Sequence, residues 1–321
     1  MPTKQDSKNA TKKLEQMIKT TRAIAIMALV VGIIAFLMGA IPIAMNLLQG
    51  PSPNFGNTLA GINQPFTPAQ LAVINNASLA NFETAGEMYL NHSLPNVGTV
   101  QPQQTNALII NGKPSIIYLG AISCIYCGEN RWAMALALGK LGHFNALYNG
   151  YSALQDGDVP TVYWLPVSYN ISSGVSFGAN YTSPYINFLS IEYESKITQG
   201  FQIQPLTYFQ AQSQTLGNGG YINATGIMLS LNNFQGTPYT IWGRNVVTGA
   251  DAIAFTNGTT TIMNMTHADV LRQLAAPNNI FAWEQYAGAD LYIAMACASL
   301  SNSTPVCALP AIKAIQKTSG Y

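Results

Sequence analysis

Residues 115–127 read SIIYLGAISCIYC, an apolar run that leads through a short connector into a Cys-x-x-Cys motif. The β-branched and aromatic side chains at the start of this run favour a buried strand. Residues 128–141 are rich in Ala, Leu and Met and stop before Gly142, as expected of a helix with a glycine at its end. Cys124 and Cys127 are therefore predicted to lie where a buried strand passes into a helix.

A helix N-terminus favours cysteine chemistry, because its unpaired N–H groups and dipole lower the pKa of a thiol. Two intervening residues let the second thiol reach a mixed disulfide formed by the first. We expect Cys124 to be the exposed attacking cysteine and Cys127 the resolving one. Glu129 and Arg131 are the nearest charges and are assigned a supporting role. Two alternatives stay open: a static structural disulfide, and half of a zinc site, for which no second Cys/His pair has suitable spacing.

The rest of the chain alternates between strand-like and helix-like segments. Residues 107–110 and 115–119 flank a strong turn signal, Asn-Gly-Lys-Pro, and predict a hairpin. Thr67 as N-cap and Pro68 at the first helical position predict a helix upstream. Further helices are predicted over 79–90, 207–214, 221–231, 267–275 and 281–297, and extended segments over 159–167, 185–194, 239–242 and 246–255.

Thr237 and Pro238 precede the predicted strand 239–242. Taken alone, Pro238 is a proline at the start of a strand. The order strand, Cys-x-x-Cys, helix, strand, helix, Pro-strand, strand, helix nevertheless resembles the thioredoxin-like superfamily. That resemblance implies an α/β fold, a central mixed sheet flanked by helices, here with helical additions. It also implies a cis-proline at Pro238 facing the cysteines, with Thr237 and Pro238 binding the substrate chain.

A closer resemblance is to an archaeal, membrane-anchored family known as domain of unknown function 929, over roughly residues 65–310. Its residues here are Gly120, Ala121, Cys124, Cys127, Arg131, Trp132, Ala137, Leu138, Gly142, Thr237, Pro238, Tyr239, Cys297, Pro305, Val306 and Cys307. Ile125 stands where that family often has proline. The resemblance implies a thioredoxin-like surface protein and brings no established activity.

Two positions depart from thioredoxins. Ser123 replaces the tryptophan usually found before the first cysteine, and Tyr118 replaces the buried acid that shuttles protons in reducing thioredoxins. If the protein is catalytic, these departures favour an oxidase or isomerase over a reductase. An inert disulfide stays open.

The second cysteine pair, Cys297 and Cys307, is separated by nine residues. Four cysteines allow three pairings, and sequence distance favours 124–127 with 297–307. In an oxidising external compartment, Cys297 and Cys307 are predicted to form a structural disulfide.

Residues 23–48 carry no charge and as a helix would span about 39 Å, enough to cross a bilayer core of about 30 Å. They predict a transmembrane anchor; a cleaved signal peptide and a buried core helix are the alternatives. Six basic residues precede this span, and none follows until Lys113. The positive-inside rule then places the N-terminus in the cytoplasm and the C-terminal domain outside the cell membrane.

These observations divide the chain into a cytoplasmic basic tail (1–22), the transmembrane helix (23–48), a linker (49–66), the extracytoplasmic domain (67–310) and a C-terminal tail (311–321). Beyond the span, eight basic and eleven acidic residues give a net charge near −3, which excludes a nucleic-acid footprint. Asn-x-Ser/Thr sequons predict glycosylation at Asn76, Asn91, Asn170, Asn180, Asn223, Asn257, Asn264 and Asn302.

Two functional hypotheses follow. The first is a membrane-anchored thiol–disulfide oxidoreductase without cofactor or metal, acting on cysteine-containing secreted or surface proteins. The second is a non-catalytic, glycosylated cell-surface protein with structural or binding roles. A filament subunit built on a pilin-like helix over 19–45 is a third, unsupported by any processing site.

Overall fold

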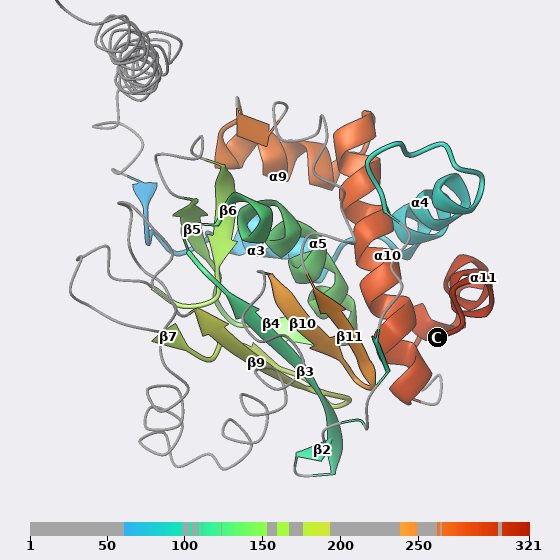
Figure 1. Cartoon of the computed structure of the whole chain (residues 1–321). Helices are drawn as coiled ribbons and strands as arrows, with labels where there is room; N and C mark the ends of the chain where they lie inside the picture. Colours follow the sequence, from blue (N-terminus) through green and yellow to red (C-terminus); the bar gives the residue numbers. More distant parts are fainter. Residues whose placement is uncertain are drawn as a thin grey trace, which may run out of the picture. The chain divides into compact units, whose positions relative to one another are not determined.

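The computed structural model describes residues 61–98, 103–104, 107, 109–110, 112–122, 124–152, 159–166, 176–192, 238–248, 262–263, 265–300 and 304–321. The predicted anchor 23–48 and the predicted helices 207–214 and 221–231 lie outside these residues. Within the part that is described, no helix combines the length and apolar character needed to cross a membrane. Element labels follow Figure 1.

A mixed β-sheet is the centre of the fold (Figure 1). Its strands run in the order β1 (Gln103–Gln104), β11 (Asn245–Thr248), β10 (Tyr239–Trp242), β3 (Lys113–Gly120), β9 (Asn187–Glu192) and β7 (Ser176–Phe177). The central strand β3 pairs parallel with β9 and antiparallel with β10. Strand β2 (Ile109–Ile110) forms the predicted hairpin with β3. The predicted α/β class with a mixed sheet is confirmed.

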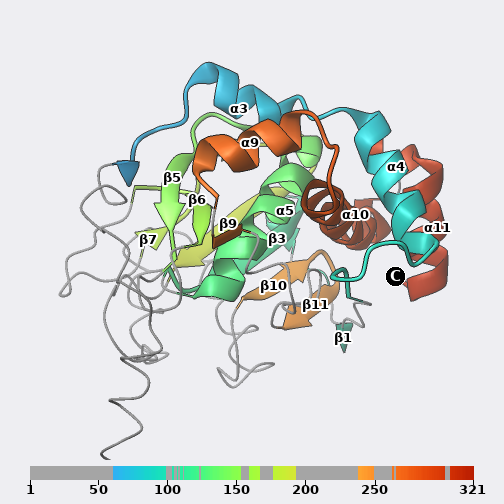
Figure 2. The ribbon, with the colours of Figure 1, turned by 90° about the horizontal axis from the view of Figure 1, so that it is seen from above.

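The described helices gather on one face of this sheet (Figure 2). They are α3 (Pro68–Asn75), α4 (Leu79–Leu90), α5 (Ile125–Leu141), α9 (His267–Ala275), α10 (Ile280–Leu300) and α11 (Pro310–Ser319), with a 3-10 turn at Val306–Ala308. Two small antiparallel pairs complete the described elements: β4 (His143–Phe144) with β8 (Tyr181–Thr182), and β5 (Tyr148–Tyr151) with β6 (Pro160–Tyr163).

Local capping explains where several helices begin. The Thr67 side chain accepts from the Gln70 amide, and the Gln70 side chain accepts from the Thr67 amide, so α3 starts with a capping box. Thr266 and Asp269 form the same arrangement at α9. These reciprocal bonds satisfy N–H groups that a helix start otherwise leaves unpaired.

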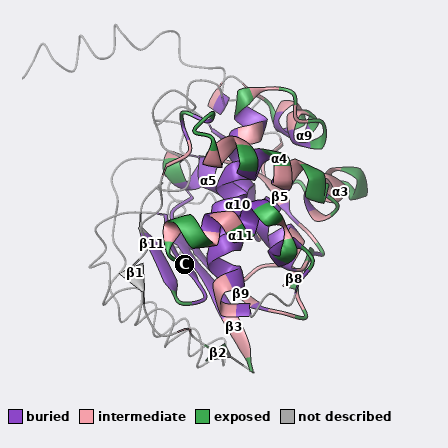
Figure 3. Ribbon diagram, turned by 90° about the vertical axis from the view of Figure 1, so that its right-hand side faces the viewer, coloured by how far each residue is buried: buried purple, intermediate pink, exposed green. Residues whose placement is uncertain are grey.

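The two longest of the described helices, α5 and α10, form the centre of the helical layer. Both are buried on nearly every side, whereas α3, α9 and α11 each expose one face (Figure 3). A helix that is apolar all round is stable only when neighbours cover it completely. Trp242 of the sheet stacks on Tyr292 of α10, with ring centroids 4.6 Å apart, and joins this layer to the strands.

Two predicted boundaries differ from the structure. The predicted linker 49–66 includes Phe66, which is buried and whose amide donates to the Leu147 carbonyl at 2.8 Å. The predicted tail 311–321 forms most of α11, which buries Ile312 and Ile315. Phe66 and helix α11 therefore pack into the domain, because their apolar side chains find a surface to cover.

The predicted disulfide between Cys297 and Cys307 is present and ties the end of α10 to the turn before α11. We expect the double variant Cys297→Ala/Cys307→Ala to lose about 2–3 kcal/mol of unfolding free energy, because the unfolded chain regains the freedom of the closed loop. Urea unfolding of both proteins measures this loss. If the two proteins had the same urea midpoint and the same dependence of the unfolding free energy on urea, the expected loss would be contradicted.

Candidate functional site

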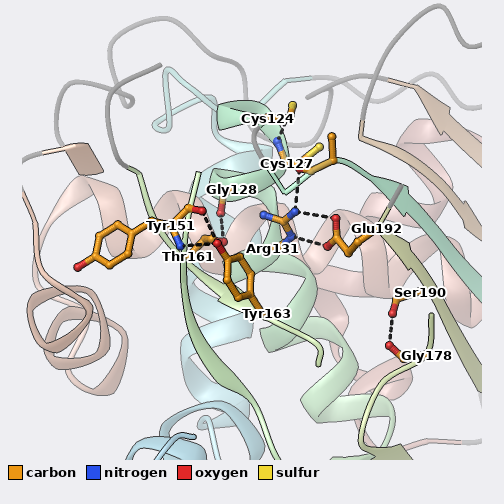
Figure 4. A network of polar contacts seen from close by, with 11 residues as sticks. Cys124, Cys127, Gly128, Arg131, Tyr151, Thr161, Tyr163, Gly178, Ser190 and Glu192 are labelled. Atoms are coloured by element: carbon orange, nitrogen blue, oxygen red, sulfur yellow. Dashed lines mark hydrogen bonds and ion pairs between the residues drawn. The ribbon is translucent and has the colours of Figure 1, made fainter. Parts of the chain in front are cut away.

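The Cys-x-x-Cys motif lies at the first turn of α5, directly beyond the end of β3 (Figure 4). Cys124 is the N-cap residue, and its Sγ accepts a hydrogen bond from the Cys127 amide at 3.3 Å. The Gly128 amide donates to the Cys124 carbonyl at 2.9 Å. An amide that points at the sulfur favours its ionised form, so this geometry is suited to a reactive thiol.

Both sulfurs are nevertheless covered. Cys124 is 2% exposed and Cys127 0%, so the expectation that Cys124 is exposed is wrong. Burial raises the pKa of Cys127 well above its ordinary value, and its hydrogen bond with Cys124 adds to this shift. Tyr126, between the two cysteines, is 43% exposed and marks the part of the motif that faces outward.

Pro238 precedes β10 on the strand next to the motif. The antiparallel register pairs Tyr239 with Leu119, so one step further Pro238 comes beside Gly120, the last residue of β3. Pro238 is buried, and Thr237 lies outside the described residues. The proline therefore borders the strand end from which the chain continues to Cys124.

A buried ion pair lies beneath the cysteines (Figure 4). Arg131 Nε donates to Glu192 Oε1 and Arg131 Nη2 donates to Glu192 Oε2, each at 2.9 Å. Nη2 also donates to the Ala121 carbonyl at 3.0 Å. Glu192 ends β9 and pairs in register with Gly120, so the fold brings this carboxylate to the strand end that carries the motif.

Burial and charge act against each other in this pair. Burial by itself would lower the pKa of Arg131, but the Glu192 carboxylate outweighs it and holds that pKa above its ordinary value. Burial raises the pKa of Glu192, and Arg131 opposes that shift. The guanidinium also lies 5.6 Å from the Tyr118 ring centroid and 5.9 Å from that of Tyr163, which supports the cation.

The Tyr118 side chain points along β3 toward Gly120, the last residue of the strand. A Cβ at Gly120 would collide with its phenol ring and hydroxyl, so this position requires glycine. Burial raises the pKa of Tyr118 well above its ordinary value, and the phenol therefore stays neutral.

Glu129, predicted to support the cysteines, is 1% exposed and interacts instead with Glu284 of α10. Burial, followed by the charge of Glu284, raises the pKa of Glu129 to about 8. Burial also raises the pKa of Glu284, whose Oε1 accepts from the Asn96 amide at 3.2 Å. Of the two predicted supporting charges, Arg131 lowers the pKa of Cys127, whereas Glu129 interacts with Glu284.

The first turns of α5 are fixed by the small β5–β6 sheet. Thr161 Oγ1 donates to the Gly128 carbonyl at 2.6 Å, and Trp132 Nε1 donates to the Pro160 carbonyl at 2.8 Å. His267 Nε2–H donates to the carbonyls of Gly150, at 2.7 Å, and Thr161, at 2.9 Å. Burial lowers the pKa of His267, so its imidazole is neutral and links β5 to β6 through these two hydrogen bonds.

The remaining predicted sites fall in different places. Asn76 and Asn91 are exposed helix C-caps, whereas Asn180 is half-buried and donates to the Tyr148 hydroxyl at 3.2 Å. The other predicted sequon asparagines, Asn170, Asn223, Asn257, Asn264 and Asn302, lie outside the described residues. Among the residues that the structure describes, no three His, Cys, Asp or Glu side chains converge as they would around a metal ion.

Sequence reasoning missed Glu192 and the partners of His267. Glu192 fell inside the predicted strand 185–194, and the available signal was a carboxylate that directly follows the apolar stretch 186–191. A charge inside a buried strand needs a partner, but the partner, Arg131, is 61 residues away.

The fold and the site together define an α/β protein with a Cys-x-x-Cys motif at the N-terminus of a buried helix. Residues 100–243 match the model of the protein family described as Domain of unknown function (DUF929), the family that the motifs resemble. The matched part includes both cysteines of the motif, the Arg131–Glu192 pair and Pro238. No curated protein and no solved structure matches the chain.

Proposed function

We propose that the protein is a membrane-anchored, extracytoplasmic thiol–disulfide oxidoreductase with a thioredoxin-like fold. The observation that carries this proposal is the Cys127 amide, which donates to the Cys124 sulfur at the N-terminus of α5. The strand order β9–β3–β10–β11, with Pro238 opening β10 beside the motif, supports the thioredoxin-like assignment. The charge-free span 23–48 and the basic residues before it support the anchor and its orientation.

In the oxidising direction, a substrate thiolate attacks Cys124 Sγ of a Cys124–Cys127 disulfide. The Cys124–Cys127 bond breaks, its electron pair passes to Cys127 Sγ, and a mixed disulfide forms between substrate and Cys124. A second substrate thiolate then attacks the substrate sulfur of that mixed disulfide, forming the substrate disulfide and releasing Cys124 as a thiolate. The substrate loses two electrons and the motif gains them. Cysteine-containing secreted or surface proteins are the proposed substrates.

A second candidate is a non-catalytic, glycosylated cell-surface protein in which the motif is a structural bridge. The burial of both sulfurs favours this alternative, because an attacking thiolate needs access. The exposed sequons at Asn76 and Asn91 are compatible with it.

The reduction potential of the motif separates the two candidates. We expect a value near −200 mV or higher for the full-length Cys297→Ala/Cys307→Ala variant, in which only Cys124 and Cys127 titrate, because labile and catalytic disulfides lie in that range. Glutathione titration followed by alkylation and mass shift measures it. Adding Cys124→Ser must abolish the transition. A potential below about −300 mV would identify a structural bridge and rule out the oxidoreductase.

A further inference from the structure

An open pocket lies at the end of α5 that is far from the cysteines. The 17 residues of this helix separate its two ends by about 25 Å. The pocket, of about 470 Å³, lies between the residues that follow α5, the segment Thr182 to Tyr185 and the turn that contains Pro305. Its volume falls in the range of about 300–1,000 Å³ that is typical of small-molecule sites. It is therefore separate from the Cys-x-x-Cys motif.

The charge around this pocket has one sign. Lys140, in the last turn of α5, lines it together with His143 of β4, and none of the described lining residues is an Asp or Glu. Lys113 Nζ donates to the carbonyl of Ser183, another lining residue, at 2.8 Å. Only eight basic residues follow the predicted membrane span, so two lysines at one segment are a marked concentration of positive charge. Such a lining favours an anionic ligand.

The ammonium group of Lys140 is fixed in position and has no counter-ion among the described residues. Its Nζ donates to the carbonyls of Asn75, at 3.0 Å, and Ala77, at 2.6 Å, and lies 6.0 Å from the Phe82 ring centroid. Burial lowers the pKa of Lys140, and no described carboxylate opposes that shift. An ammonium group has three N–H donors, so one donor and an uncompensated charge remain for a ligand.

The usual role of a lysine in this position does not account for Lys140. A lysine near a helix C-terminus commonly binds the last carbonyls of its own helix. Here other side chains do so, since the Tyr181 hydroxyl donates to the Leu138 carbonyl and the Ser183 hydroxyl donates to the Leu141 carbonyl. Lys140 is therefore not required as a hydrogen-bond donor at the end of α5.

The remaining lining offers an apolar surface beside this cation. Pro184 and Pro305 are exposed and Tyr185 is half-buried, and all three line the pocket. In small-molecule sites such a surface contacts the body of the ligand, while a few polar groups fix its orientation. An inorganic anion would leave most of the 470 Å³ unfilled, so the pocket suits an anion that also carries a ring or a short chain.

We propose that this pocket binds a small organic anion. Its carboxylate or phosphate group pairs with Lys140 Nζ and accepts a hydrogen bond from the His143 imidazole. Its body lies against Pro184, Tyr185 and Pro305. The ligand thus supplies the counter-ion that Lys140 lacks among the described residues. The site does not depend on the redox chemistry of the motif, so it holds for both candidate functions.

The test is isothermal titration calorimetry of the full-length protein in mild detergent with phenyl phosphate, benzoate and glucuronate. We expect at least one of these anions to bind with a Kd below about 1 mM. Phenol, benzamide and glucose are their uncharged counterparts and should bind at least about 10-fold more weakly, because they cannot pair with the ammonium group. The preference between phenyl phosphate and benzoate identifies the oxyanion. If no anion binds below about 1 mM, or an anion and its uncharged counterpart bind equally, the inference is overturned.

Two variants assign the binding to Lys140. Lys140→Met keeps much of the aliphatic stem and removes the charge, so it should weaken the affinity for the tightest anion about 10-fold or more. Lys317→Met, at an exposed lysine of α11, is the matched control and should leave that affinity unchanged. Equal affinities of the wild type and Lys140→Met would show that this lysine does not hold the anion.

A second measurement needs no variant and covers the case in which Lys140→Met does not fold. Hydrogen–deuterium exchange of the wild type should slow on addition of the tightest anion in peptides that cover 140–145 and 182–186. Peptides that contain Cys124 should exchange as before. Binding without protection of either segment would place the anion elsewhere and contradict the assignment.

Discussion

Arg131→Met is expected to lower the free energy of unfolding by about 3–5 kcal/mol, because it leaves the Glu192 carboxylate buried without its partner. Arg131 is 0% exposed and Glu192 3%, so water cannot replace the lost hydrogen bonds. The Met side chain keeps much of the apolar stem, and the change therefore reports the charge more than the packing. Urea unfolding of the full-length protein in mild detergent measures the loss.

Two further variants identify its cause. The double variant Arg131→Met/Glu192→Met should regain most of the loss, because an apolar replacement of a whole buried pair is often close to neutral. Arg272→Met removes a cation whose pairing with Asp269 is exposed on α9, and should leave the midpoint nearly unchanged. A single Arg131→Met variant as stable as wild type would show that the pair does not hold α5 to β9.

Glu129→Gln is expected to make the protein more stable at pH 7–8 and to flatten its dependence on pH. Burial and Glu284 raise the pKa of Glu129 in the folded state from 4.5 to about 8. Between these values the unfolded chain has lost a proton that the folded protein still holds, so wild-type stability falls as pH rises through this window. A shift of this size corresponds to roughly 5 kcal/mol in total. The Gln amide has nearly the same size as the carboxyl group, but it does not titrate.

The measurement is the unfolding free energy of both proteins at intervals between pH 4.5 and 8.5. The unfolding free energy of the wild type should fall more steeply across that range than that of Glu129→Gln. The difference in slope should reach at most the value for one bound proton. Burial also raises the pKa of Asp290, so part of the slope should persist in the variant. Parallel curves for the two proteins would contradict a buried proton on Glu129.

The parts of the fold that local sequence determines were predictable. The bounds of α4 and α9 follow from caps and apolar spacing and agree with the structure, as does the hairpin of β2 and β3. Strands β4 and β8 have two residues each and pair across 39 positions, so neither carries a pattern of its own. Helix α11 did carry a signal, Pro310 at its first turn and an apolar pair three residues apart, Ile312 and Ile315.

The site divides in the same way. Its covalent part, Cys124 and Cys127 at a helix start, was visible in 13 residues of sequence. Its electrostatic part was not, because Glu192 reaches Arg131 only after β9 pairs parallel with β3. The burial of Cys124 was also beyond local reasoning, since exposure depends on which distant segments cover a position.

The sulfur of Cys124 has two roles: it caps the N-terminus of α5 by accepting a backbone hydrogen bond, and it is the proposed nucleophile. For the first role cysteine is a poor choice, because Ser, Asp and Asn are the strong helix N-caps. Substitution by serine would give the helix a better start and remove the chemistry in the same step. Selection for stability therefore favours Ser, Asp or Asn at position 124, whereas selection for thiol chemistry favours Cys. A relative with Ser or Asp here would have kept the scaffold and given up exchange.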